Sequence, residues 1–233
     1  MKTVKLLLIE DDIHLGYIIK SGMEDVIGGY EVSLASNGKE GLESLKSFSP
    51  DVVVSDIEMP VMNGFEMVKK IRQTDLDLPV IFATGKNSPK DVTVGYDVGA
   101  DNYIKKPFTP EELDAHVKSL INIKTNSRLR LKNAVHKIGK YTFQPKNFTL
   151  TYDDSEEKIL TARESQILEL LLRQKGEIVK REDFLETFWE NQDPVYASRS
   201  LDVFITKLRA YLSKDPSISI RNVKMTGLIL NFD

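Results

Sequence analysis

The chain has 233 residues, of which 41% are hydrophobic, and it contains no cysteine. This length supports one large domain or two ordinary ones with a stable core, and the lack of cysteine excludes disulfides, thiolate nucleophiles and thiolate metal sites. The net charge of −3 is unevenly distributed: residues 1–123 carry 13 Lys and Arg and 20 Asp and Glu, a balance of −7, whereas residues 124–233 carry 19 and 15, a balance of +4. Opposite charges in the two halves suggest two domains, the second of which is suited to bind a polyanion.

In the first half, short apolar runs alternate with segments of helical spacing. The runs lie at residues 4–9, 31–35, 52–54, 79–83 and 102–104. The apolar stripes between them consist of Ile13, Tyr17, Ile18 and Met23, then Leu42 and Leu45, then Phe65, Val68 and Ile71. Thr109, Pro110 and Glu112 form the capped start of a last helix. Five repeats of strand and helix predict an α/β fold, a doubly wound five-stranded parallel sheet whose continuous apolar strands are buried on both faces.

The second half has a different pattern. Residues 136–154 alternate like antiparallel strands, and Thr161 with Glu164 forms a capping box that opens a helix. Two more helices are expected at about 180–190 and 197–212, followed by two β-like pieces at 219–224 and 228–232. Three helices and a terminal hairpin predict an α+β winged helix-turn-helix domain. The expected boundaries are a first domain at 1–123, a basic linker at 124–135 that partly extends the preceding helix, and a second domain at 136–233.

Polar residues follow the predicted parallel strands at the edge where such sheets bind ligands. Asp56 ends the third strand, Thr84 the fourth and Lys106 the fifth, whereas the first is followed by Glu10, Asp11 and Asp12. Clustered carboxylates repel one another unless a cation lies among them, and oxygen ligands suit Mg²⁺. A carboxylate beside Mg²⁺ with Lys and Thr opposite can accept a phosphoryl group, so Asp56 is the candidate nucleophile.

Each of these residues also has an ordinary structural interpretation. Asp56 alone would be a turn residue, and the acids at 10–12 could cap a helix. Lys105 and Lys106 alone would be a solvated pair, and Thr84 alone a structural residue. Their order at successive strand ends favours the site.

Four stretches, "LLLIEDD", "SDIEMPVMNGFE", "PVIFATG" and "GADNYIKKPFTPEEL", closely resemble the CheY-like receiver domain of two-component response regulators. Three others, "LTARE", "LELLL" and "RSLDVFITKLR", resemble the winged-helix output domain of the OmpR/PhoB class. Together the two resemblances cover nearly the whole chain.

The receiver resemblance implies a role for each matching residue. Asp56 would accept a phosphoryl group from a sensor histidine kinase, with Lys106 and Thr84 assisting. Mg²⁺ would be bound by Asp11, Asp56 and the backbone carbonyl of Glu58, and by Glu10 through a water molecule. Thr84 and Tyr103 would form the switch pair, and the bond between Lys106 and Pro107 would be cis. The phosphorylated protein would form a homodimer through the last strand and its flanking helices, where His116 replaces the usual arginine.

The third helix of the second domain is the expected DNA-reading element. Its apolar residues Leu201, Phe204, Ile205, Leu208 and Leu212 should face the core. Near or on the open face are Ser198, Arg199, Ser200, Val203, Thr206, Lys207 and Ala210, of which Arg199, Ser200, Val203, Thr206 and Lys207 are candidates for contacts with double-stranded DNA. Arg209 and, in the wing, Lys224 are candidate phosphate contacts. Met225 and Leu228 replace a glycine and an aromatic residue that are usual in the wing of relatives, and the loop at 191–198 resembles a segment that meets RNA polymerase.

The expected function is a phosphorylation-switched transcription regulator that binds promoter repeats. The alternatives are a DNA-binding regulator independent of phosphorylation and an aspartyl-phosphate phosphohydrolase, although Met59 and Pro60 break the motif of the latter class. The chain is not expected to be an enzyme beyond phosphoryl transfer and dephosphorylation at Asp56. The short apolar run at the start fits neither a signal peptide nor a membrane span, so we expect a cytoplasmic protein.

Overall fold

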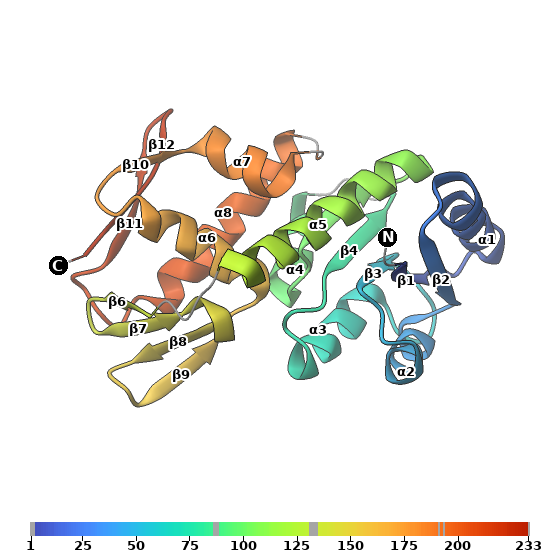
Figure 1. Cartoon of the computed structure of the whole chain (residues 1–233), viewed down its shortest axis with the longest axis horizontal. Coiled ribbons are helices and arrows are strands. Elements are labelled where there is room, and N and C mark those ends of the chain that lie inside the picture. The colour runs from blue at the N-terminus through green and yellow to red at the C-terminus, as the bar shows by residue number, and fades with distance from the viewer. Residues whose placement is uncertain (1–2, 86–88, 131–134, 191, 193, 233) are drawn as a thin grey trace. The chain divides into compact units, whose positions relative to one another are not determined.

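The computed structural model describes residues 3–85, 89–130, 135–190, 192 and 194–232 (Figure 1). By its internal contacts the chain divides into one unit of residues 1–121 with 191–196 and another of residues 122–190 with 197–233. Residues 131–134 of the expected linker lie outside the described part, and the domain boundaries stay a prediction. No described helix is both long and apolar enough to cross a lipid bilayer.

The first unit alternates strands and helices. Its elements are β1 (Val4–Ile9), α1 (Ile13–Ser21), the π-helix η1 (Gly22–Ile27), β2 (Tyr30–Ala35), α2 (Gly38–Phe48), β3 (Val52–Ser55), α3 (Gly64–Thr74), β4 (Val80–Thr84), α4 (Pro89–Val98), β5 (Asn102–Lys105) and α5 (Pro110–Arg130). The strands form one parallel sheet in the order β2-β1-β3-β4-β5, which is the flavodoxin-like order. The predicted α/β fold is therefore confirmed.

The parallel sheet is buried on both faces, as its continuous apolar strands predicted. Leu6 and Leu8 of β1 share a buried cluster with residues of α1 and α5, which therefore cover one face. On the other face, Met67 of α3 packs beside Gly41 of α2. Each buried aliphatic side chain contributes about 1.5–3 kcal/mol, so the sheet dominates the stability of this unit.

The predicted core stripe of α1 is wrong at three positions. Ile13, Tyr17 and Ile18 are 61%, 60% and 67% exposed. The buried residues of this segment are Gly16 and Ile19 in α1 and Gly22 and Met23 in the following π-helix. Gly16 faces the sheet, and a Cβ atom there would lie 3.8 Å from side-chain atoms of Glu10 and Leu34, an ordinary contact distance. Apolar residues lie all around α1, so spacing alone could not select the face that packs.

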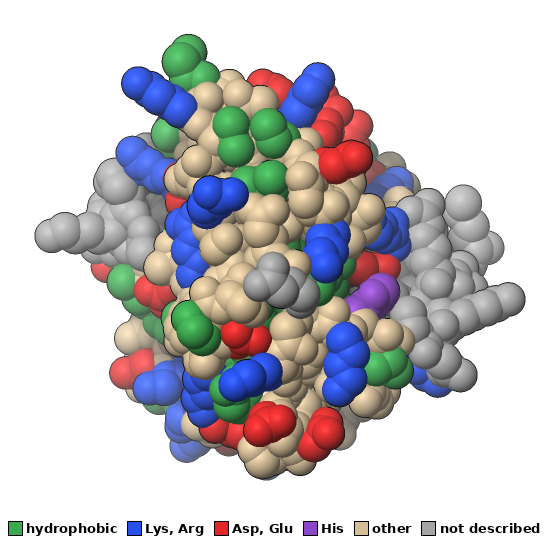
Figure 2. Space-filling model, turned by 90° about the vertical axis from the view of Figure 1, so that its left-hand side faces the viewer, with side chains coloured by type: hydrophobic (Ala, Val, Ile, Leu, Met, Phe, Trp, Pro, Cys, Tyr) green, Lys and Arg blue, Asp and Glu red, His purple; other side chains and the backbone are tan. Residues whose placement is uncertain are grey.

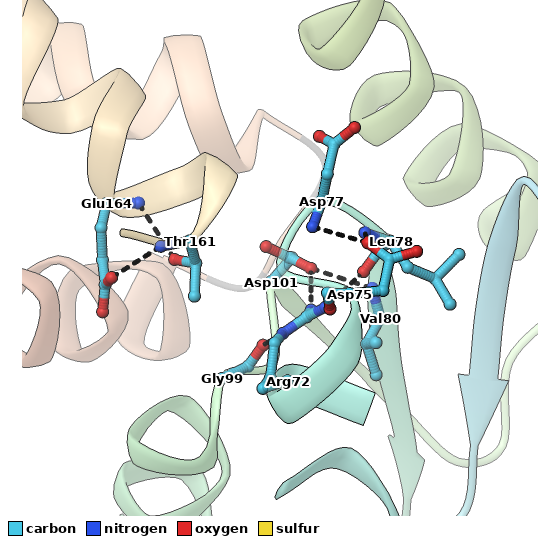
Figure 3. A network of polar contacts seen from close by, with 9 residues as sticks. All are labelled: Arg72, Asp75, Asp77, Leu78, Val80, Gly99, Asp101, Thr161 and Glu164. Carbon is cyan, nitrogen blue, oxygen red and sulfur yellow. Dashed lines mark hydrogen bonds and ion pairs between the residues drawn. The ribbon is translucent and has the colours of Figure 1, made fainter. Parts of the chain in front are cut away.

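An arginine fixes the start of two strands in this unit (Figure 3). Arg72 of α3 forms an ion pair with Asp101, with 2.8 Å between Nη2 and Oδ2, and the same oxygen accepts a bond from Val80 N at 2.9 Å. Arg72 also donates to the carbonyls of Gly99 and Leu78 at 2.8 and 2.7 Å. The guanidinium thus satisfies backbone acceptors before β4 and β5, whose far ends carry Thr84 and Lys105.

Where the second unit is described, it contains two antiparallel sheets and the helices α6, α7 and α8. Its elements are β6 (His136–Ile138), β7 (Tyr141–Gln144), the 3-10 turn η2 (Pro145–Asn147), β8 (Thr149–Tyr152), β9 (Glu156–Ile159), α6 (Ala162–Arg173), β10 (Ile178–Lys180), α7 (Arg181–Trp189), α8 (Pro194–Tyr211), β11 (Ser219–Val223) and β12 (Gly227–Asn231). The sheet orders are β6-β7-β8-β9 and β10-β12-β11. The α+β arrangement with a terminal hairpin confirms the predicted winged-helix architecture.

Local signals explain most of this unit. The predicted capping box of α6 is present, with Thr161 N donating to Glu164 Oε2 at 2.8 Å and Glu164 N donating to Thr161 Oγ1 at 3.3 Å (Figure 3). The strand β9 was not predicted, because its sequence EEKI is charged and all four residues are exposed. Charged edge strands of this kind discourage pairing with other chains. The helix α8 begins three residues before the expected position.

The turn between β11 and β12 places a methionine in the left-handed region. Met225 has φ = 57° and is 98% exposed, while Thr226 N donates to Val223 O at 3.0 Å. Gly227 then passes close to Val179, where a Cβ atom would lie 2.0 Å from the carbonyl oxygen. Gly227 is therefore needed for the close approach to β10. Met225 is the residue of the turn that adopts the unfavourable left-handed conformation.

Replacing Met225 by glycine should therefore stabilise the second unit by about 0.5–1 kcal/mol. Relief of the left-handed conformation contributes about 1–2 kcal/mol, and the greater freedom of glycine in the unfolded chain offsets part of it. Urea denaturation followed by circular dichroism measures the change. Met225→Ala is the matched control, because alanine keeps the Cβ atom; equal stabilisation by both variants would show that the turn is not strained.

Candidate functional site

Backbone contacts place Asp56 beside the end of β1. Asp56 N donates to Ile9 O at 2.9 Å, so the third strand continues alongside the first one residue beyond their last ladder pair. Gly64, the first residue of α3, lies so close that a Cβ atom there would be 2.3 Å from Asp56 O. The Asn63-Gly64 pair therefore has two functions: Asn63 Oδ1 caps α3 through Glu66 N at 2.9 Å, and Gly64 makes room for the Asp56 backbone.

Three carboxylates meet at this edge of the sheet. One oxygen from each of Glu10, Asp11 and Asp56 lies within 4.8 Å of the others. Glu10 is buried, Asp56 half-buried and Asp11 exposed. Asp12 does not join this group, because its Oδ1 caps α1 by accepting bonds from His14 N and Leu15 N at 2.9 and 3.1 Å. The structure thus separates the acidic run into two ligand candidates and one helix cap.

Lys106 provides the positive charge among these acids. Its Nζ lies 2.5 Å from Glu10 Oε2 and 2.5 Å from Asp56 Oδ2. Its backbone is fixed beside β4, because Lys106 N donates to Thr84 O at 2.9 Å. The bond between Lys106 and Pro107 is cis, as predicted. The neighbouring Lys105 is exposed.

The two oxygens of Asp56 have different environments. Its Oδ1 accepts bonds from Ile57 N at 2.5 Å and Glu58 N at 3.3 Å, whereas Oδ2 contacts Lys106. Two backbone amides and one ammonium therefore orient the carboxylate at the end of its strand. The side chain of Glu58 is exposed, and its predicted role through the backbone carbonyl stays a prediction.

Burial and neighbouring charges shift the pKa values of Glu10 and Lys106. Desolvation raises the pKa of Glu10 although Lys106 lowers it, and the charge of Asp56 raises it further. Burial alone would lower the pKa of Lys106, but its bonds and attraction to Asp56 and Glu10 prevail and raise it. Lys106 is thus held as a cation, while the ionised form of Glu10 is disfavoured by the fold.

The donor set fits a divalent cation. Three carboxylates against one ammonium leave two negative charges when all four groups are ionised. Two unit charges about 4 Å apart interact by about 4 kcal/mol at an effective dielectric of 20, so this excess favours binding of a small cation. Carboxylate oxygens that are partly open to solvent suit Mg²⁺, which keeps part of its water shell.

Thr84 and Tyr103 are both buried. They are 6% and 4% exposed, at the end of β4 and within β5. The Tyr103 ring packs against Phe82 and Tyr96, with centroid distances of 5.4 and 5.0 Å. The side chain of Tyr103 therefore points inward.

His116 makes an internal contact on α5. It is 3% exposed, and its Nδ1 lies 3.0 Å from Asn102 Nδ2. Asn102 Oδ1 accepts a bond from Tyr103 N at 2.8 Å, so the Asn102 amide nitrogen is the group that faces the histidine. In this orientation of the amide, Nδ1 is the acceptor of the contact. Sequence reasoning placed His116 at a dimer interface and missed this contact with β5.

The core face of α8 is as predicted. Leu201, Phe204, Ile205, Leu208 and, just past the end of the helix, Leu212 are all buried. Ser200 is also fully buried, so the expectation that it lies near the open face is wrong. It follows Ala197 by three residues and precedes Phe204 by four, and this spacing within the buried stripe was the available signal.

The other candidate DNA contacts of α8 differ in their solvent exposure and in their contacts within the protein. Thr206 is exposed, and Arg199 and Val203 are half-buried. Lys207 forms an ion pair with the buried Glu164 of α6 at 3.3 Å, and only 16% of its side chain is exposed. Arg209 donates to Ile220 O at 2.8 Å and to Asn222 Oδ1 at 2.9 Å, and so ties α8 to β11. Sequence reasoning missed both contacts, because each partner is distant in sequence.

The wing residue Lys224 is exposed at the β11–β12 turn. Figure 2 shows Lys and Arg side chains spread over one face of the molecule, with Asp and Glu between them. The basic balance of the second half is therefore distributed rather than gathered into one block on this face.

Each half of the chain matches a known protein family. Residues 6–118 match the model of the response regulator receiver domain, and residues 155–230 match that of the C-terminal domain of transcriptional regulatory proteins. The transcriptional regulatory protein RprY of Bacteroides fragilis is 35% identical over 224 residues, which cover 96% of this chain and 93% of RprY. The alkaline phosphatase synthesis transcriptional regulatory protein PhoP of Bacillus subtilis is 30% identical over 233 residues, covering 96% and 94%.

Among solved structures, a RitR mutant shares the fold with a TM-score of 0.76, covering 99% of this chain and 100% of its own at 20% identity. The sequence matches extend over the acidic edge of the sheet in the first unit and over α8 and the wing in the second. This chain belongs to the family of two-component response regulators that join a receiver domain to a DNA-binding transcriptional regulatory domain of the OmpR/PhoB class.

Proposed function

We propose that phosphorylation of Asp56 by a partner sensor histidine kinase switches the DNA binding of this regulator. The observation that carries the proposal is the position of Lys106 Nζ, 2.5 Å from both Asp56 Oδ2 and Glu10 Oε2 at the edge of the parallel sheet. A carboxylate oriented by two amides, beside an ammonium and two further acids, is suited to receive a phosphoryl group.

The chemistry is a displacement at phosphorus. An oxygen of Asp56 attacks the phosphorus of a phosphohistidine, the P–N bond breaks, and the imidazole leaves with its electron pair. Lys106 neutralises the phosphoryl oxygens, and the Thr84 hydroxyl donates a hydrogen bond to one of them. Transfer to Asp56 and its later hydrolysis are the only reactions that we propose for this chain.

Asp11, Asp56 and the backbone carbonyl of Glu58 would hold Mg²⁺, and Glu10 would act through a bound water molecule. The metal would supply charge neutralisation for the incoming phosphoryl oxygens. The support for this assignment is the excess of carboxylates over Lys106 within a group of oxygens that lie within 4.8 Å of one another.

In the switch that we propose, Thr84 moves toward the phosphoryl group and stabilises the inward orientation of Tyr103. A local change in charge can act at a distance when it shifts the equilibrium between the two orientations of such an element. The phosphorylated protein then forms a homodimer through α4, β5 and α5, which aligns two output domains on promoter repeats. The loop at 191–198, of which residues 191 and 193 lie outside the described part, would meet RNA polymerase, and the protein would act in the cytoplasm.

On DNA, we propose that α8 reads the major groove through Arg199, Val203 and Thr206. Arginine can bind guanine with two hydrogen bonds, and valine can contact a thymine methyl group. Arg209 and Lys224 would contact phosphate, as would Lys207 after leaving Glu164. Such contacts position the protein without specifying sequence.

One observation favours a second candidate, a regulator that binds DNA without phosphorylation. Tyr103 is 4% exposed and points inward, the orientation that the proposed switch assigns to the active form. Equal DNA affinity of the unphosphorylated and phosphorylated protein would support this candidate.

The first experiment incubates the protein with Mg²⁺ and acetyl phosphate and measures its intact mass. We expect one added phosphoryl group that requires Mg²⁺, is labile in base and is absent from Asp56→Asn. Asp25→Asn, which changes an exposed aspartate of η1, should be labelled like the wild type. A folded wild-type protein that is labelled neither by acetyl phosphate nor by a cognate kinase would contradict the proposal.

The raised pKa of Glu10 predicts that Glu10→Gln stabilises the receiver unit at pH 7. Because the folded-state pKa lies above the unfolded value, the cost of the ionised group is fully present above the folded pKa. That cost disappears as the pH falls below the unfolded value of about 4.3. Thermal denaturation should therefore show a midpoint a few degrees higher for Glu10→Gln at pH 7 and a smaller difference near pH 4.

The exposed Glu43 of α2 provides the control, because Glu43→Gln should leave the midpoint unchanged at both pH values. If Glu10→Gln lowers the midpoint at pH 7, the ion pair with Lys106 outweighs the cost of burial and the assignment is wrong.

The role of α8 predicts that Arg199→Ala weakens binding to a specific duplex about tenfold or more. A bidentate arginine–guanine contact discriminates by about 1–3 kcal/mol. The probe is a duplex enriched by the wild-type protein from a random pool, and fluorescence anisotropy gives the affinity. Arg173→Ala on α6 removes the same charge from an exposed side chain paired with Glu169 and should have little effect. Equal weakening by both variants would indicate a general charge effect instead of base reading.

A further inference from the structure

The interior of α4 contains a glycine that its backbone does not require. Gly95 lies within the helix Pro89–Val98, and its φ is not among the positive values found for other glycines of the described chain. Glycine is, after proline, the least favourable residue in a helix interior. A reason for Gly95 must therefore lie in its surroundings.

The hydroxyl of Tyr103 occupies the space beside Gly95. A Cβ atom on residue 95 would lie 1.4 Å from Tyr103 Oη and 2.6 Å from Cζ, far inside any real contact. The third neighbour, Phe65 Cε1, would be 3.2 Å away. Any side chain at position 95 is therefore incompatible with Tyr103 as the structure has it, and removing the hydroxyl alone would not relieve the overlap with Cζ.

The same aromatic group reaches the phosphorylation site through a second glycine. The Tyr103 ring packs on Phe82, and Phe82 Cε1 would lie 2.9 Å from a Cβ atom on Gly64. That Cβ atom would also lie 2.3 Å from the Asp56 carbonyl oxygen. Two positions without side chains thus enclose the packed rings of Phe82 and Tyr103, one beside Asp56 and one in α4.

We propose that Gly95 is a positioning residue: the space that it leaves open holds Tyr103 inward and so sets the balance between the inward and outward orientations. Residue 95 thereby determines what fraction of the molecules has Tyr103 inward before Asp56 is phosphorylated. The regulatory part rests on the proposed function, in which Tyr103 is the switch residue. The positional part depends on geometry alone.

The positional part is tested on the full, unphosphorylated chain with Gly95→Ala. We expect Tyr103 to turn outward, so that tetranitromethane modifies it at least tenfold faster than in the wild type, as measured by peptide mass spectrometry. Gly16→Ala is the matched control, because it also adds a methyl group within a helix but its nearest neighbours would be 3.8 Å away. Unchanged protection of Tyr103 in a folded Gly95→Ala variant would overturn the proposal.

A double-mutant comparison covers the case in which Gly95→Ala folds poorly. We expect Gly95→Ala to lower the thermal midpoint in the wild-type background and to raise it in a Tyr103→Ala background, where the overlap is gone and alanine favours the helix. A rise in both backgrounds, or an equal fall in both, would show that Tyr103 is not the reason for Gly95.

The regulatory part is tested with acetyl phosphate and Mg²⁺ by sedimentation velocity. At equal phosphorylation, measured by intact mass, Gly95→Ala should form at least threefold less dimer than the wild type, and Gly16→Ala should match the wild type. An undiminished dimer fraction in Gly95→Ala would overturn the regulatory part. If the wild type neither takes up phosphate nor dimerises, the proposed function fails, and the nitration experiment still decides the position of Tyr103.

Discussion

The ammonium of Lys106 between Asp56 and Glu10 is the interaction on which the arrangement of the acidic site depends most. Parallel strands bring their carboxyl ends to one edge, and in this chain three of those ends carry acids or a lysine. Without a cation, the carboxylates would repel one another in a partly desolvated place. Lys106 offsets part of that repulsion, and a backbone hydrogen bond to Thr84 O positions it there. The fold thus keeps Glu10 at this edge although burial raises its pKa and disfavours its ionised form.

Much of this arrangement could be predicted from the sequence, because buried parallel strands appear in it as continuous runs of apolar residues. The acids after β1 and β3 and the Lys-Pro pair after β5 stand at defined chain positions, so strand order alone brings them together. Capping signals such as Thr161 with Glu164 are equally local. The features that could be predicted are therefore those that residues within one short segment determine by themselves.

The remaining features depend on partners that are distant in sequence. Apolar side chains surround α1, so only packing shows that Ile13 and Tyr17 face outward. Ser200 looks like a surface residue until its place in the buried stripe of α8 is known. The bonds from Arg209 to β11 and from Lys207 to Glu164 join segments that no local pattern connects. In the DNA-binding unit these contacts link α8 to α6 and to β11, so that Arg209 and Lys207 have structural partners within the unit.

The contact between His116 and Asn102 changes what the final receiver helix can offer to a neighbour. The contact between Nδ1 and the Asn102 amide nitrogen orients the ring toward β5. An arginine at the same place would bring a permanent charge and would need an acid as its partner. With histidine, the side chain is 3% exposed and packs inward against β5. An association across this helix would consequently rely on its exposed neighbours, such as Lys118, which is paired with Asp114 at 2.7 Å.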